Sequence, residues 1–241
     1  MKFVARIPVL VAIVAFAALA ALAFSGFGVR QGWWTIRTGF QVLEWSAYGG
    51  LAAAALALVV LFFSKLRTGA LSVLLAAIAV GLVTGYLPWQ WKQQAQALPK
   101  IHDISTDLDN PPRFVKVLPL RAGSPNQAEY GGPQIAAAQK AGYPDIQPRE
   151  TALTPSDAFA RALAAAKAMG WEIIDVDANY GVIEATATTL WFGFKDDVVI
   201  RISPSVSGSR IDMRSVSRVG KSDVGANAAR IRNFFGKLAD K

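Results

Sequence analysis

The side chains best suited to chemistry lie near the C-terminus, in the run RSVSRVGKSDVGAN that begins at Arg214. Its basic residues are Arg214, Arg218 and Lys221, and Ser222 and Asp223 come directly after them. Ser222 and Asp223 are good N-cap residues because their oxygens can accept the free N–H groups of a first helical turn. Such a turn, with cations beside it, suits an anionic group. Because anion sites are rarer than capped helices, a well-capped connection without a ligand is the preferred interpretation of the loop, and an anion site is the functional hypothesis.

The elements that must position this run are a strand before it and a helix after it. Ile211, Met213 and Ser215 alternate with other residues at the period of two that is typical of a half-buried strand. The final helix is expected to extend to about Leu238 with an apolar stripe. The run is therefore predicted to lie at the N-terminus of the last helix.

A second hypothesis rests on His102, the single histidine of the chain. A hydroxyl nucleophile needs a base within reach. A hydrolase or lipid-modifying enzyme would therefore use His102 with Asp103, or Ser217 or Ser222 with Asp223. One histidine and no cysteine give little support for a metal centre, so no metal and no cofactor are predicted. A non-enzymatic binding role is preferred, and an enzyme is left open.

An aromatic cluster forms a third candidate. Trp191, Phe192 and Phe194 surround Gly193 at the expected tip of a hairpin. Three aromatic side chains are costly to expose to water. They are predicted either to cover an end of the core or to contact lipid or a partner protein.

The charge distribution separates the chain into two parts. The formal net charge is +8, and six basic residues but a single acidic one, Glu44, fall within residues 1–91. The remaining basic and acidic residues are interspersed, without the basic run that a nucleic-acid binder would need. Nucleic acid is therefore not an expected partner.

Three apolar stretches are long enough to cross a bilayer core as helices. They are predicted at residues 7–27, 47–63 and 70–87, and Pro88 is expected to end the third. Between the first two, Trp33, Ile36, Phe40 and Leu43 recur at helical spacing. This spacing predicts a short separate helix in the headgroup region.

The flanking charges predict the orientation. Lys2 and Arg6 precede the first span, and Lys65 and Arg67 lie between the second and the third. By the positive-inside rule, the N-terminus and the loop between the second and third spans belong in the cytoplasm. The C-terminal domain of an inner-membrane protein would then be periplasmic. The first span is expected to stay as an uncleaved anchor, with cleavage near Ala23 as the alternative.

The remainder is predicted to be an α+β domain. Pro111 and Pro112 indicate an extended connector, and Thr154 is a strong helix start. A short helix is expected at 133–141, and strands at 171–176, 182–191, 198–203 and 211–216. Short strands joined by hairpin turns form an antiparallel meander, and the helices before and after it predict a two-layer sandwich.

The strands also predict a polar face. Glu184 and Thr186 share one side of their strand, and Arg201, Asp212 and Arg214 are polar residues of the next two. Such a face is usually the solvated side of an antiparallel sheet. The alternative is the floor of a groove beside the loop that follows Arg214.

Three segments resemble a bacterial and plastid family known as domain of unknown function 1499. They are IHDISTDLDNPPRF (101–114), FKDDVVIRI (194–202) and RSVSRVGKSDVGANAARI (214–231). The three-span N-terminal part is similar to a membrane-anchored subset of that family. The resemblance implies no established reaction, so no catalytic residue is carried over.

Together these observations predict three parts: a membrane domain at 1–91, a connector at 92–114 and a soluble α+β domain at 115–241. The protein is expected to bind an anionic ligand, a lipid or a protein partner, with the bilayer, a membrane protein or an anionic lipid as partners. The predicted ligand-binding residues are Arg201, Arg214, Ser217, Arg218, Gly220, Ser222, Asp223, Asn227 and Arg230. From the sequence alone, Arg218→Ala is expected to weaken binding with little change in thermal stability.

Overall fold

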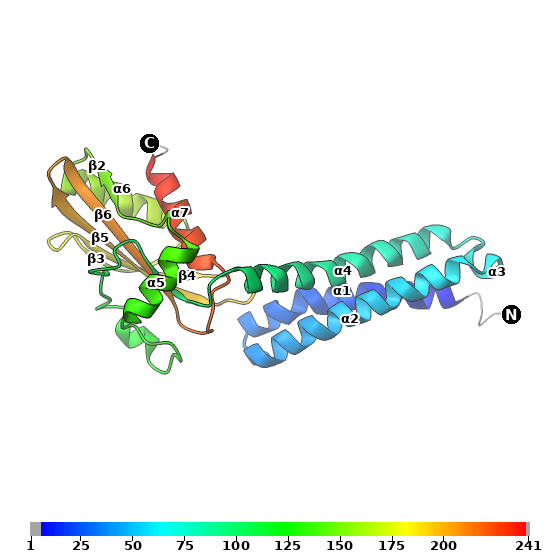
Figure 1. Ribbon diagram of the computed structural model, residues 1–241. Coiled ribbons are helices and arrows are strands. Elements are labelled where there is room, and N and C mark those ends of the chain that lie inside the picture. The colour runs from blue at the N-terminus through cyan, green and yellow to red at the C-terminus, as the bar shows by residue number, and fades with distance from the viewer. Residues whose placement is uncertain (1–5, 240–241) are drawn as a thin grey trace. The chain divides into compact units, whose positions relative to one another are not determined.

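The computed structural model describes residues 6–239 and divides into two compact units (Figure 1). The helical unit extends to Gln94 and includes the distant segment Leu190–Gly193. The α+β unit consists of Ala95–Thr189 and the chain from Phe194 onward. Lys2, which contributes to the predicted orientation, lies outside the described residues.

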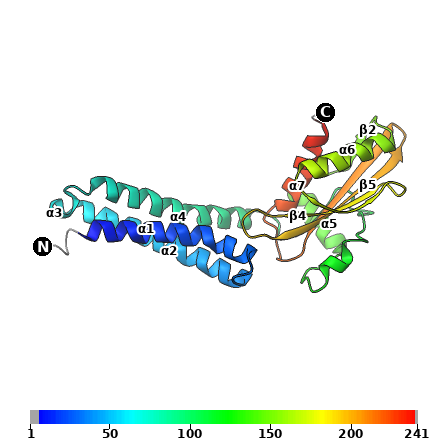
Figure 2. The same cartoon turned by 180° about the vertical axis from the view of Figure 1, so that it is seen from behind.

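Three long helices and one short one build the helical unit. They are α1 (Ile7–Arg30), α2 (Ile36–Leu61), α3 (Ser64–Arg67) and α4 (Leu71–Ala97). The three long helices lie side by side, as both views show (Figure 2), and each is long and apolar enough to cross a membrane. The prediction of three spans is therefore confirmed, by length and composition.

Two predicted helix boundaries are wrong. The short helix expected around Phe40 is the beginning of α2, because Thr35 caps that helix and no proline interrupts it afterwards. The third span does not end at Pro88, since α4 continues through this proline to Ala97. Pro88 removes one backbone donor, but the glutamines and alanines after it favour a helix.

Small residues allow these helices to approach closely. Ala15, Ala53 and Ala77 are fully buried between them. A Cβ atom added to Gly81 of α4 would collide with the carbonyl oxygen of Gly50 in α2. Close contact of backbones at small residues is a common way for apolar helices to associate.

The aromatic tip Leu190–Gly193 completes the helical unit. The indole of Trp191 donates a hydrogen bond to the carbonyl of Ala23, at 2.8 Å, and its ring lies 5.0 Å from that of Trp91. Phe192 is buried, and its ring stacks on that of Phe40 at 5.1 Å. The tip therefore packs on helices of its own chain. Contact with lipid or another protein stays a prediction.

A six-stranded antiparallel sheet forms the centre of the α+β unit. Its strands are β1 (Asp103–Ser105), β2 (Arg149–Thr151), β3 (Glu172–Asp177), β4 (Val182–Thr188), β5 (Lys195–Ser205) and β6 (Gly208–Ser217). The order is β1-β6-β5-β4-β3, and β2 also pairs with β6. The predicted meander of four strands is confirmed as β3 to β6. The short strands β1 and β2 were not predicted, and β1 lies within the expected connector.

Helices α6 (Pro155–Ala168) and α7 (Ala226–Ala239) cover one face of this sheet (Figures 1 and 2). The Thr154 side chain caps α6 by accepting the N–H of Asp157, as its sequence predicts. Ile183, Ile200 and Phe234 are fully buried between the two layers. The predicted α+β class is confirmed.

The opposite face of the sheet is not solvated, so that prediction is wrong. Residues 106–131 cover it with irregular chain and the 3-10 turn Leu118–Arg121, and α5 (Gly132–Gly142) follows them. Glu184, Asp197 and Arg214 are 1%, 0% and 2% exposed. The Glu184 carboxylate accepts the backbone N–H groups of three consecutive residues, 115–117. Polar side chains on this face therefore supply hydrogen bonds that the irregular cover lacks within itself.

Candidate functional site

Arg214 is held by an ion pair inside the α+β unit. Its Nε and Nη2 donate to the two carboxylate oxygens of Asp103 at 2.9 and 2.7 Å. The guanidinium also lies over the rings of Phe114 and Tyr130, at 5.1 and 5.3 Å from their centroids. The charge of Arg214 is thus already balanced, and the residue binds β1 to β6.

Arg218 shares a buried carboxylate with Arg121. Its Nε and Nη2 donate to Asp197 at 2.9 and 2.8 Å, while Arg121 donates to the same group at 2.5 Å. Burial alone would raise the pKa of Asp197. The hydrogen bonds from Arg218, Thr186 and Arg121 outweigh that effect and hold the pKa below its usual value. Asp197 is therefore a stable anion that pins the covering segment to the sheet.

Arg230 and Asn227 attach α7 to the sheet. Arg230 donates to Asp196 at 2.5 Å and to the hydroxyl of Ser215 at 2.9 Å. The amide nitrogen of Asn227 donates to Ser217 Oγ and to the carbonyl of His102, both at 3.0 Å. The structure thus brings the predicted residues Ser217, Asn227 and Arg230 together, and their polar groups bond to one another or to the sheet.

The N-terminus of α7 is occupied by Asp223. Its two carboxylate oxygens accept the N–H groups of Gly225 and Asn227 at 2.9 and 2.8 Å. Burial is the largest influence on this carboxyl and raises its pKa. Ser222 accepts the N–H of Val224, and Gly220 has a φ of 94° that favours glycine. An external anion at this helix end would have to compete with Asp223.

Arg201 lies apart from the other predicted residues. It donates to Asp107 at 3.0 Å and to Asp212 at 2.9 Å. All four predicted arginines therefore already have a carboxylate partner in the described structure. Ligand binding by the nine residues stays a prediction, and an incoming anion would have to replace one of these carboxylates.

The groups named for the enzyme hypothesis also serve as structural acceptors. Asp103 next to His102 accepts from Arg214, and Asp223 accepts from the backbone of its own loop. The Ser217 hydroxyl accepts from Asn227. Within residues 6–239, no group of three or more His, Cys, Asp or Glu could hold a metal ion.

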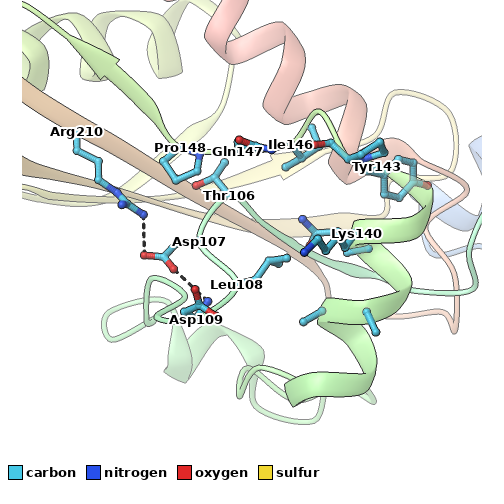
Figure 3. Close-up of a pocket in the computed structure, with 14 residues that line it drawn as sticks. Thr106, Asp107, Leu108, Asp109, Lys140, Tyr143, Ile146, Gln147, Pro148 and Arg210 are labelled. Carbon is cyan, nitrogen blue, oxygen red and sulfur yellow. Dashed lines mark hydrogen bonds and ion pairs between the residues drawn. The ribbon is translucent and has the colours of Figure 1, made fainter.

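A pocket of about 470 Å³ lies elsewhere in the α+β unit, between α5 and the edge of β6 (Figure 3). Its walls come from the loop after β1, from α5, from the segment before β2 and from Arg210. Leu108, Ile146 and Pro148 contribute apolar surface, and Thr106 and Gln147 contribute polar groups.

Lys140 and Arg210 are the basic residues of this pocket. Arg210 donates to Asp107 at 2.9 Å and also pairs with Asp212. Lys140 points from α5 into the pocket (Figure 3), and its ammonium has no hydrogen bond or ion pair with the described residues. Because Asp107 is already neutralised by Arg201 and Arg210, Lys140 is the cation of this pocket that remains available.

The wall that carries Lys140 is fixed firmly. The adjacent residue Gln139 is fully buried, and its amide accepts the N–H of Ser105 at 2.9 Å and donates to the Ser105 carbonyl at 2.6 Å. This side chain thus imitates a neighbouring strand along β1. Sequence reasoning missed the pocket. The available signal was the long Gly- and Pro-rich stretch before β2, where Tyr143 suits a wall over the sheet.

Comparison with known proteins agrees with the resemblance seen in the sequence. A search of curated proteins and a search of solved structures each gave no match. Residues 103–238, more than half of the chain, match the family model described as "Protein of unknown function (DUF1499)". The chain therefore belongs to the DUF1499 family.

Proposed function

We propose that this protein is a multi-pass bacterial inner-membrane protein with a cytoplasmic N-terminus and a periplasmic α+β unit. This unit acts as a binding module, not as an enzyme, and takes a small anionic ligand in the pocket beside α5. The bilayer is its first partner, and a membrane protein or an anionic lipid is a further one. Nucleic acid is not a proposed partner, because the chain lacks a basic run.

The observation that carries the proposal is Lys140, a cation on a pocket wall whose ammonium has no ion pair within residues 6–239. A ligand anion can pair with this ammonium without breaking any existing ion pair, whereas the predicted arginines would each have to release a carboxylate. Breaking a buried pair leaves an uncompensated charge behind. The pocket is therefore the less costly place for an anion, and its apolar wall suits the ligand's carbon skeleton.

Ligand-dependent stabilisation tests the pocket. Full-length protein in mild detergent is melted with sodium phosphate, glycerol 3-phosphate or citrate, against sodium chloride of equal ionic strength. A ligand that binds only the folded state raises the melting temperature. We expect at least one anion to do so for the wild type and for the control Lys167→Met, a change at an exposed lysine of α6.

The variant Lys140→Met is expected to lose that increase. If Lys140→Met retained it in full, the ligand would bind elsewhere and the pocket assignment would be wrong. If none of the three anions stabilised the wild type, the proposed preference for small anions would be rejected. Equal ionic strength is needed because salt screens exposed charges in every sample.

The proposed orientation has a separate test, which the absence of cysteine makes simple. Val206→Cys places a thiol in the exposed β5–β6 turn, and Ser64→Cys places one at the exposed start of α3. In cells with a permeabilised outer membrane, an impermeant maleimide is expected to label position 206 and to spare position 64. The reverse labelling would place the α+β unit in the cytoplasm.

A further inference from the structure

The segment that covers the polar face of the sheet presents an aliphatic surface of its own. Val115, Leu118 and Leu120 are 61%, 42% and 50% exposed, whereas Val117 between them is fully buried. Three exposed aliphatic side chains within six residues are unusual for a surface that meets only water.

The exposure of these side chains is not the result of a loosely held segment. The Glu184 carboxylate accepts the N–H groups of residues 115–117, and Arg121 at the end of the segment pairs with buried Asp197. The 3-10 turn Leu118–Arg121 lies between these two attachments. The aliphatic groups are therefore held outward by a rigid backbone.

Basic residues accompany the aliphatic ones. Arg113 and Lys116 are exposed, and within the described chain neither side chain forms an ion pair. Arg113 and Leu118 also line the same hollow of about 440 Å³, so they lie on one surface. Aliphatic groups interspersed with free cations are typical of surfaces that bind anionic lipid bilayers.

The position of this surface within its unit supports the same partner. The Leu120 carbonyl accepts from Arg218 at 2.8 Å, and the Arg218 N–H donates to the carbonyl of Lys195 at 3.0 Å. Lys195 is next to Phe194, where the chain enters the α+β unit from the tip that belongs to the helical unit. The surface thus lies near the point where the chain of the α+β unit continues from the tip Leu190–Gly193.

We propose that residues 113–120 dock on the membrane surface. Val115, Leu118 and Leu120 enter the boundary between headgroups and acyl chains, and Arg113 and Lys116 contact the phosphates of anionic lipids. This inference does not depend on a ligand in the α5 pocket or on which side of the membrane the α+β unit lies.

Single cysteines allow a direct test, because the chain has none of its own. Leu118→Cys and the control Val206→Cys, at a fully exposed position of the β5–β6 turn, are labelled with an environment-sensitive fluorophore. Each full-length variant is placed in nanodiscs that contain doxyl-labelled lipids, with phosphatidylcholine alone or mixed with phosphatidylglycerol. We expect severalfold stronger quenching at position 118, increased by phosphatidylglycerol. Equal quenching at the two positions would overturn the proposal.

The role of charge has its own variant. The double change Arg113→Gln and Lys116→Gln, made in the Leu118→Cys protein, is expected to remove the effect of phosphatidylglycerol. The melting temperature should not change, because neither side chain forms an ion pair with the described residues. An unchanged phosphatidylglycerol effect would refute the cationic contact. Shielding of the label that rises with protein concentration, without doxyl quenching, would identify a contact between copies and exclude the membrane.

Discussion

The arginines on the polar face of the sheet form ion pairs that hold together segments distant in sequence. Arg214 joins β6 to Asp103 of β1, and Arg218 joins the loop after β6 to Asp197 of β5. Burying both charges of a pair is costly, and the pair repays that cost only when its remaining hydrogen bonds are made. These pairs do make them, with backbone carbonyls of the covering segment.

Arg218→Ala is therefore expected to lower the free energy of unfolding by about 3 kcal/mol, since it leaves fully buried Asp197 with one guanidinium partner in place of two. This reverses the expectation drawn from the sequence, which foresaw little change in stability. Denaturant melts of the full-length protein in detergent measure the effect.

The pair Arg232–Asp145 provides the control, because its side chains are 44% and 54% exposed. Arg232→Ala should cost less than about 1 kcal/mol, as exposed ion pairs usually do. If the two variants were equally stable, the buried pair would not fasten the fold, and Arg218 would again become a candidate for ligand binding.

Asp197 also predicts how stability depends on pH. Its pKa in the folded protein lies below the ordinary value of 3.8, so above pH 3.8 both states are ionised and the stabilisation is complete. As the pH falls below that value, the unfolded chain binds the proton first and stability declines. Asp197→Asn should be less stable than wild type at pH 7 and show a shallower decline below pH 4. If the stability of Asp197→Asn declined as steeply as that of the wild type, other carboxyl groups would be the cause of the decline.

At the scale of elements, the packing of α4 on α2 depends on the absence of a side chain at Gly81. Gly81→Ala is expected to destabilise the helical unit by about 1–3 kcal/mol, because the new methyl group meets the Gly50 carbonyl. Gly49→Ala is the matched control, since its methyl group would lie 3.7 Å from Ala18 in ordinary contact. Thermal melts in detergent should separate the two variants, and equal melts would show that α4 can move away from α2.

The elements that sequence reasoning found are those whose own residues specify them. Thr154 and the residues after it start α6 by local capping, and the alternating residues of β3 to β6 specify their strands. The strands β1 and β2 have three residues each, too few for a period, and exist because β6 offers them partners. The buried polar face was unpredictable for a similar reason: its cover is irregular chain, which carries no periodic signal. In the sequence, Lys140 cannot be distinguished from other surface lysines, because the walls of its pocket come from segments that are distant in sequence.

At the scale of the whole molecule, the chain passes between the two units three times, after Gln94, after Thr189 and after Gly193. The second and third passages bring the Trp191 and Phe192 rings into the helical unit. A protease site inserted between Pro99 and Lys100 should therefore cut the chain without releasing the C-terminal fragment from washed membranes. The packing of the tip would retain it.

Trp191→Ala with Phe192→Ala should release that fragment after cleavage in high salt, where peripheral lipid contacts are weak. The uncut double variant serves as the control for folding and membrane insertion. Release of the wild-type fragment to the same extent would show that the aromatic tip does not hold the two parts together.

The same tip has a consequence for how the protein is made. Phe192 fills a hollow left by Gly26 and Gly39, where a Cβ would come within 2.7 and 3.3 Å of its ring. The ribosome completes α1, α2 and α4 before it reaches this phenylalanine. Until then, the helices lack the ring that fills the space beside Gly26 and Gly39. A chain truncated anywhere before Leu190 never fills that space. We therefore expect the helices of such an incomplete chain to be less closely packed around Gly26 and Gly39 than those of the full protein.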